Sequence, residues 1–350
     1  MFGRRRGGGN YAYITARVKA KRSFLLKEDS YQKMLLMNLP EISNFIDEAG
    51  YPEIAEFADE FDGVNLIEHA TYANMARLFR DILKSTTGEL HNVLAATLGK
   101  WDIWNLRVIL RSKLYGISSD DIKKDLVLAG CLSADKLERL MALDSEEDVV
   151  RNYGKMTGTL IPENLLVTFK EQESSAPIED FLEKSYYKNL LKHTNPKSRP
   201  VCIYRNFVRS EIDVINIETI LKLKLEGIYG EDVTKYIIHG GKKIDERLAT
   251  RLANVETISA MMNDLTHLKF YDDIKEVLGS DINSLSDIAA GMKRYRMRMA
   301  RSFSHLYPLS VIPVIDYLIR KENEVNNIRI VARGIKNDLD RNTIEGLLVI

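Results

Sequence analysis

Cysteine is scarce in this sequence, with two residues among 350. Cys131 and Cys202 show neither the paired spacing of a disulfide framework nor that of a metal-binding motif, so we interpret them as reduced, buried thiols. Long apolar runs are missing as well, since no stretch approaches the roughly 18–20 residues that a membrane-spanning helix needs. The first ten residues, MFGRRRGGGN, contain no apolar segment typical of a signal peptide. Together these absences indicate a globular protein of a reducing compartment.

Neither sign of charge is in excess. The chain has 50 Lys and Arg residues and 50 Asp and Glu residues, which gives a formal net charge of zero. Nucleic-acid binding is normally accompanied by a strong basic excess, so we predict no nucleic-acid partner. The apolar fraction of 45% is ordinary for a globular protein and allows a substantial buried core.

Recognised catalytic motifs are also missing. None of the six histidines has a His, Cys or acidic companion at a metal-ligand spacing. The stretch Gly240-Gly241-Lys242-Lys243 lacks the leading glycine and the Ser or Thr of a nucleotide-binding P-loop. No GxSxG elbow or nucleophilic cysteine signature is present. We therefore predict no enzyme activity, no metal, no cofactor and no nucleotide, with a site that matches no motif as the alternative.

What the sequence does contain is one segment three times. The segment DIWNLRVILRSK at 102–113 returns as DVINIETILKLK at 213–224 and as EVNNIRIVARGIK at 324–336. Apolar residues at spacings of three, six and seven predict an α-helix with one buried stripe in each copy. Each copy has one asparagine at the same place, and consecutive asparagines are 111 residues apart: Asn105, Asn216 and Asn327.

The polar positions of the repeated helix suggest two roles. Asparagine is unfavourable inside a helix, so its presence in all three copies predicts one shared internal hydrogen bond, with a contact to a partner as the alternative. Each copy begins with an acid and carries a base nine positions later, namely Arg111, Lys222 and Arg333. These bases either stabilise the helix end through its dipole or line a socket for a partner.

The register continues beyond the helix. Gly116 and Gly227 stand where the helix is expected to end, and a second pair, Gly130 and Gly241, follows. A short helix is predicted to begin near Asp121, Asp232 and Thr343. The sequence therefore predicts three helical repeat units, at 10–130, 131–241 and 242–350, after a flexible basic tail at 1–9.

Three further segments carry expectations. Residues 41–62 contain eight acids and no Lys or Arg, which predicts helices with an acidic solvent face or a docking face for a basic partner. Residues 152–177 are polar with scattered Gly and Pro and are predicted to be a surface loop. The predicted helix 285–303 is the most basic stretch, and it places three bases on one face for solvent or for an acidic partner: Arg294, Arg298 and Arg301.

The two ends of the chain carry a family resemblance. The run from Tyr307 to Ser310, the Lys321-Glu322-Asn323-Glu324 run, Asn327-Ile328-Arg329 and the start from Tyr11 to Arg17 together resemble the C subunit of archaeal A-type ATP synthases. The C subunit is the counterpart of the d subunit in V-type ATPases. The resemblance covers nearly the whole chain, including the threefold repeat, and leaves the Arg-Gly tail outside.

The resemblance implies both a fold and a function. The fold is all-α, with three pseudo-equivalent helical domains in a funnel-shaped arrangement around a central socket. The function is that of a non-catalytic central-stalk adapter, which couples the stalk subunits D and F to the membrane proteolipid c-ring and transmits torque. Such a protein is peripheral on the cytoplasmic side of the cell membrane. A free-standing helical-repeat scaffold for another complex is the alternative, because similar units can also stack as an open array.

Overall fold

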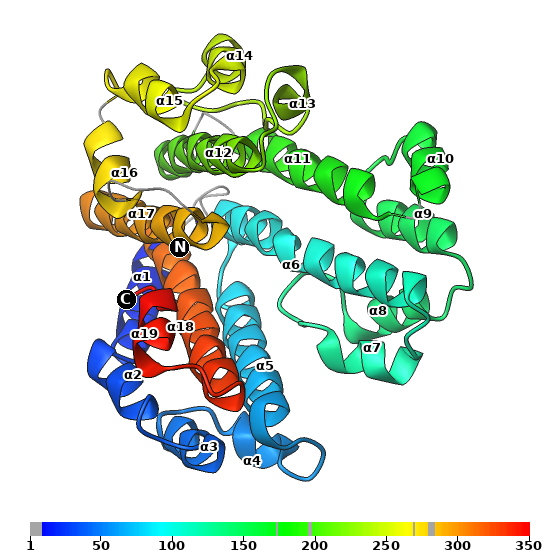
Figure 1. Cartoon of the computed structure of the whole chain (residues 1–350). Coiled ribbons are helices and arrows are strands. Elements are labelled where there is room, and N and C mark those ends of the chain that lie inside the picture. The colour runs from blue at the N-terminus through cyan, green and yellow to red at the C-terminus, as the bar shows by residue number, and fades with distance from the viewer. Residues whose placement is uncertain (1–8, 173, 195–197, 269, 279–283) are drawn as a thin grey trace, which may run out of the picture. The chain divides into compact units, whose positions relative to one another are not determined.

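The computed structural model describes residues 9–172, 174–194, 198–268, 270–278 and 284–350, and all regular structure within them is helical (Figure 1). This confirms the all-α prediction. The predicted tail lies, apart from residue 9, outside the described residues. No described helix is both long enough and apolar enough to cross a membrane.

The helices follow one order three times after α1 (Tyr11–Arg22). The first run comprises α2 (Glu28–Met34), α3 (Leu39–Glu48), α4 (Glu53–Phe57), α5 (Gly63–Lys84), α6 (Gly88–Leu114) and α7 (Ser119–Asp125). The second comprises α8 (Ala134–Met141), α9 (Glu146–Thr157), α10 (Glu163–Gln172), α11 (Ala176–His193), α12 (Arg199–Leu225) and α13 (Glu231–Thr234). The third comprises α14 (Glu246–Asn254), α15 (Ile258–Leu265), α16 (Tyr271–Leu278), α17 (Leu285–Leu306), α18 (Ile312–Lys336) and α19 (Arg341–Leu347).

The repeated segment of the sequence forms the second half of the long helices α6, α12 and α18. Both α6 and α12 have 27 residues and α18 has 25. The predicted apolar stripe is turned into the protein in each of them, as the complete burial of Leu106, Ile217 and Ile328 shows. Each long helix contacts the short helix that follows it, which is α7, α13 or α19.

The three long helices also end in the same way. Gly116 and Gly227 adopt the left-handed conformation, with φ of 67° and 75°. The next amide then donates back to a carbonyl in the last turn, as Ile117 N does to Ser112 O at 2.8 Å and Ile228 N to Leu223 O at 2.9 Å. Asp338 holds this place after α18 with φ of 51°, a conformation that Asp adopts more readily than most residues.

The chain divides into two compact units. The first contains Ile46–His193 together with Gly9, and the second contains Asn10–Phe45 together with Thr194–Ile350. The helix order repeats three times across these two units. The predicted domain boundaries at 130 and 241 therefore stay a prediction.

Two local expectations were wrong. Residues 152–177 are not one loop, because α9 continues to Thr157 and α10 follows, with Leu166 and Phe169 buried. Gly158 ends α9 in the left-handed conformation and Pro162 directly precedes α10, whereas Gly154 is buried inside α9. Both cysteines are free thiols, as expected, but Cys131 is exposed and Cys202 is only partly buried.

Candidate functional site

The three repeated asparagines make the same pair of hydrogen bonds. Each side-chain amide donates to the backbone carbonyl oxygen 22 residues later, at 2.9 Å in all three copies, to Val127, Ile238 and Val349. Each Oδ1 accepts from the backbone N–H of that same residue, at 2.8, 2.9 and 3.2 Å. All three asparagines are at least 99% buried. They tie the long helix to the segment after the short helix, so they act inside the protein.

The acids that begin the first two copies of the repeated segment also tie the long helix to a distant part of the chain, through hydrogen bonds from backbone N–H groups. Asp102 accepts from the N–H groups of Cys131, at 3.0 Å, and Leu132, at 2.9 Å. Asp213 accepts from three consecutive N–H groups, those of Lys242, Lys243 and Ile244, at 2.9 to 3.0 Å. Burial raises the pKa of both carboxyl groups, and these hydrogen bonds oppose the shift.

The second glycine pair makes this tie possible. A Cβ atom on Gly130 would lie 2.1 Å from Asp102 Oδ1, and one on Gly241 would lie 2.3 Å from Asp213 Oδ1. Carbon and oxygen atoms that are not bonded to each other cannot approach so closely. The backbone therefore reaches the buried carboxylate only where no side chain is present.

The third copy takes its partner from the beginning of the chain. The backbone N–H of Leu26 donates to Glu324 Oε2, and the buried Lys321 ammonium lies 2.8 Å from Glu324 Oε1. Arg22 pairs with Asp316 of α18 at 2.9 Å. Helix α2 contacts α18, as α8 contacts α6 and α14 contacts α12. Figure 1 shows the N-terminal helices α1 and α2, in blue, beside the orange α18.

The three helix-end bases differ in their surroundings. Arg111 forms a two-pronged ion pair with Glu179 of α11, at 2.9 and 2.7 Å. Burial alone would raise the pKa of Glu179, but hydrogen bonds from Ser175 and Arg111 and nearby arginine charges hold it below its ordinary value. Lys222 pairs with Glu218 one turn earlier at 2.6 Å, and Arg333 is exposed in the last turn of α18.

The basic face of α17 partly contacts its own compact unit. Arg294 donates to the carbonyl oxygen of Val277 at 3.2 Å, and Arg298 pairs with Glu276 at 3.0 Å, so both contact α16. Arg301 is exposed. Arg111 belongs to the first compact unit and the other five candidate bases to the second. Their contact with a partner stays a prediction.

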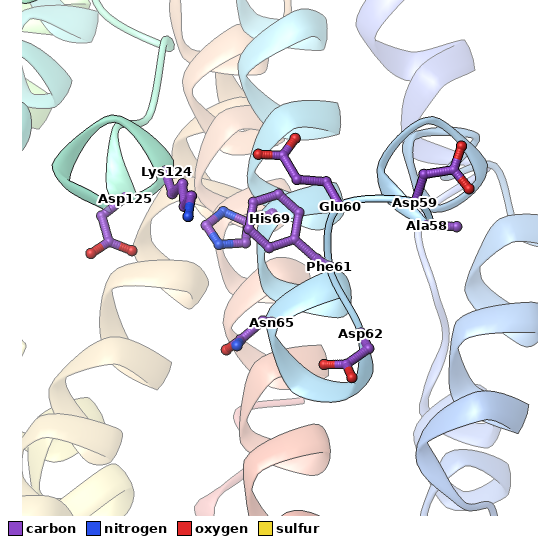
Figure 2. Close-up of a pocket in the computed structure, with 9 residues that line it drawn as sticks. All are labelled: Ala58, Asp59, Glu60, Phe61, Asp62, Asn65, His69, Lys124 and Asp125. Atoms are coloured by element: carbon purple, nitrogen blue, oxygen red, sulfur yellow. The ribbon is translucent and has the colours of Figure 1, made fainter. Parts of the chain in front are cut away.

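The predicted acidic stretch ends at a pocket of about 630 Å³ in the first compact unit (Figure 2). The Phe61 and His69 rings stack in it, with ring centres 4.0 Å apart. Burial lowers the pKa of His69, and the charge of Asp125, among others, opposes the shift. In Figure 2, Lys124 and Asp125 of α7 lie on one side of the stacked rings, and Glu60 lies on the other. Among the described residues, no group of three His, Cys, Asp or Glu side chains could hold a metal ion.

Sequence reasoning missed both this pocket and the N-terminal contact with α18. Each joins segments that are far apart in the chain, and neither repeats at the 111-residue spacing. The acidic composition of residues 41–62 was the only signal for the pocket. No signal in the sequence paired Leu26 with Glu324.

Comparison with known proteins gives one consistent result. The sequence model of the family described as "ATP synthase (C/AC39) subunit" matches residues 14–347. The chain is 35% identical over 345 residues to the C subunit of the A-type ATP synthase of Methanococcoides burtonii, covering 97% of this chain and 94% of the relative. It is 34% identical to the C subunit of the Methanosarcina acetivorans enzyme, with 99% and 95% coverage, and 32% identical to that of Haloferax volcanii, with 98% and 99% coverage.

Proposed function

The chain belongs to the ATP synthase (C/AC39) subunit family, and from this premise we propose that it couples the central-stalk subunits D and F of a rotary A-type or V-type ATP synthase to the membrane proteolipid c-ring. It is a non-catalytic subunit and transmits torque between two other parts of the rotor, for ATP synthesis or for ion pumping. Its place is peripheral, on the cytoplasmic side of the cell membrane. Its association with the membrane is indirect, through the ring.

A part that transmits torque needs stiffness, and the buried ties supply it. One ion moving through 100 mV delivers about 2.3 kcal/mol, so the adapter has to resist several such steps without yielding. In each repeat, buried polar groups fix the long helix to a segment distant in the chain, through Asn105, Asn216 or Asn327 and through the acid that begins the repeated segment. Close-packed helices with satisfied buried polar groups deform little.

We further propose that the three repeats close around a central socket and give the funnel that the family resemblance implies. The observation that carries this proposal is the contact of the first segment with the last long helix. In an open array each repeat contacts only its neighbours, so the first and last repeats would not be in contact. The backbone N–H of Leu26 donates a hydrogen bond to Glu324, as the N–H of Leu132 does to Asp102 and that of Ile244 does to Asp213. The same kind of bond at all three long helices is expected of a cyclic arrangement.

The candidate socket residues can be narrowed by their contacts. Arg111 is held by Glu179 of another helix, so reversing its charge would break an internal contact as well as any stalk contact. Lys222 is a better test position, because its ion pair with Glu218 lies within its own helix. We therefore propose Lys222 as a stalk contact, together with two bases that are exposed to solvent, Arg333 and Arg301.

The test is a pull-down of recombinant subunits D and F by the isolated chain. We expect the wild-type chain to retain both subunits, and the variant carrying Lys222→Glu and Arg333→Glu to lose at least tenfold in affinity. Lys235→Glu is the matched control, because Lys235 is equally a surface base of the second compact unit and pairs with Asp232 one turn earlier. Unchanged binding by the double variant rejects the socket assignment. Failure of the wild-type chain to bind D and F would favour the alternative, a scaffold for another complex.

A further inference from the structure

A groove of about 710 Å³ lies in the first compact unit between α6 and α11, which pack against each other, and is also lined by residues of α8 and α9. Ala96 and Gly99 of α6 and Tyr186 and His193 of α11 are among its lining residues. None of the ties described above explains why this space is left open.

The internal repeat provides the comparison. Helices α6 and α12 have equal lengths and lie 111 residues apart throughout, so Ala96 corresponds to Phe207. Phe207 is buried and meets Phe303 of α17 edge to face, with ring centres 5.6 Å apart. Lys242, which corresponds to Cys131 at the groove, lies with its ammonium 5.9 Å from the centre of the Phe303 ring. At this place beside α12 the rings of Phe207 and Phe303 pack together, whereas beside α6 the corresponding Ala96 lines the groove with Tyr186 of α11.

Of the charged side chains that line the groove, the carboxylate is already hydrogen-bonded within the protein, and the lysine ammonium is exposed to solvent. Asp102 reaches the groove, but both its oxygens accept from backbone N–H groups. The Lys136 ammonium is exposed at the groove and acts electrostatically on both Asp102 and Cys131. His193 places its Nδ1 2.8 Å from the carbonyl oxygen of Asn189, which fixes the ring at the edge of the groove. An anionic group is the complement of this rim.

We propose that the groove is a docking pocket for a partner segment that inserts an aromatic side chain next to a carboxylate, with the ring over Ala96 and the carboxylate at Lys136. Size is no obstacle, since an apolar cavity of about 150 Å³ already holds a benzene molecule. Aromatic side chains seated in well-packed, desolvated pockets are frequent hot spots of protein interfaces. The proposal rests on the proposed function in one respect, that the partner is another subunit of the same complex.

The first experiment uses the isolated chain and two small probes, N-acetylphenylalanine and its neutral amide, with binding followed by NMR. We expect one saturable site of millimolar affinity, with the carboxylate probe several-fold tighter than the amide at low salt. Lys136→Gln should remove this preference and leave the binding of the amide unchanged. Ala96→Phe should abolish the binding of both probes, because it places a ring in the groove where α12 carries Phe207.

A variant that should gain a second probe-binding site tests the same proposal in the opposite direction. Phe303→Ala removes the ring that packs on Phe207 at the equivalent place beside α12, so we expect a second probe site to appear. Phe303 is only partly buried, so its removal should leave the fold intact. No saturable binding to the wild-type chain, or binding that survives Ala96→Phe, overturns the proposal.

The second experiment asks whether the occupant is a protein segment. Cys131 lines the groove and is exposed, so its alkylation rate, measured by peptide mass spectrometry, reports access. We expect alkylation of the isolated chain and at least tenfold protection in the assembled complex, with the protection lost when Ala96→Phe blocks docking. Probe binding without protection in the complex overturns the docking role and indicates a small-molecule site. The probe result does not depend on the complex, so it stands even if the chain fails to bind D and F.

Discussion

Replacing Gly130 by alanine tests whether the buried carboxylate of Asp102 can keep its hydrogen bonds only if residue 130 has no side chain. The new Cβ would lie 2.1 Å from Asp102 Oδ1 and 2.9 Å from the backbone nitrogen of the same residue. A side-chain rotation cannot relieve a contact with backbone. Either the carboxylate or the loop must move, and both movements break the same two hydrogen bonds.

The magnitude follows from those bonds. A hydrogen bond to a charged group contributes about 1.5–3 kcal/mol, so the loss of the bonds from Cys131 and Leu132 costs about 3–6 kcal/mol. The alanine restricts the unfolded chain and returns about 0.4–1 kcal/mol. The expected net destabilisation by Gly130→Ala is therefore about 2–5 kcal/mol.

Hydrogen exchange of the Cys131 and Leu132 amides is the most local assay, combined with urea unfolding of the isolated chain. Each 1.4 kcal/mol corresponds to a factor of ten, so we expect protection to fall by about 30-fold or more. Gly99→Ala is the matched control. Its Cβ would meet nothing within 4 Å, so the same chemical change inside α6 should stabilise the chain by about 0.5–1 kcal/mol.

A double-mutant cycle separates the mechanism from a general strain. If Gly130→Ala acts by displacing the carboxylate, it should add little to the destabilisation that Asp102→Ala causes alone. Full additivity of the two changes would refute the reasoning. So would a Gly130→Ala chain in which both amides stay as protected as in the wild type.

Three further predictions concern buried polar groups. Asn216→Ala should destabilise the chain by about 2–4 kcal/mol in urea unfolding, because it leaves the N–H and carbonyl of Ile238 unpaired in the core; a loss below about 0.5 kcal/mol would contradict the tie. The folded-state pKa of Glu179 is depressed, so its contribution to stability is present above its ordinary pKa and lost as the pH falls through the folded value; the stability difference between wild type and Glu179→Gln should shrink between pH 6 and pH 3, and a constant difference would refute the assignment. Burial on α17 lowers the pKa of Lys293 to about 8, with Glu322 opposing the shift, so stability should rise with pH between about 8 and 10.5, and Lys293→Met should remove that slope.

The elements that repeat in the sequence, and the features that depend on neighbouring residues, could be predicted from the sequence. The period of 111 residues identified the long helices and their glycine ends, and it marked the three asparagines as one shared structural element. Helical periodicity and glycine ends depend on neighbouring residues, so a single sequence carries them. The partners of Asn105 and Asp102 could not be named, because a hydrogen bond to residues 22 or 30 positions away depends on how the short helix folds back.

Other features depend on packing that has no sequence period. The predicted loop at 152–177 was wrong because Gly158 and Pro162 were interpreted as loop residues, whereas they separate α9 from α10. The contact of Leu26 with Glu324 joins the two ends of the chain, and composition gives no hint of it. The groove beside Ala96 depends on how α6 and α11 pack, and the sequence alone does not show that packing.

The most direct test of the adapter role is a bridging assay. Purified proteolipid c-ring in detergent is immobilised, and recombinant subunits D and F are passed over it with and without this chain. We predict that D and F are retained only when the chain is present, in equal amounts with it. Retention of D and F on the ring without the chain, or binding of the chain to neither partner, would contradict the account.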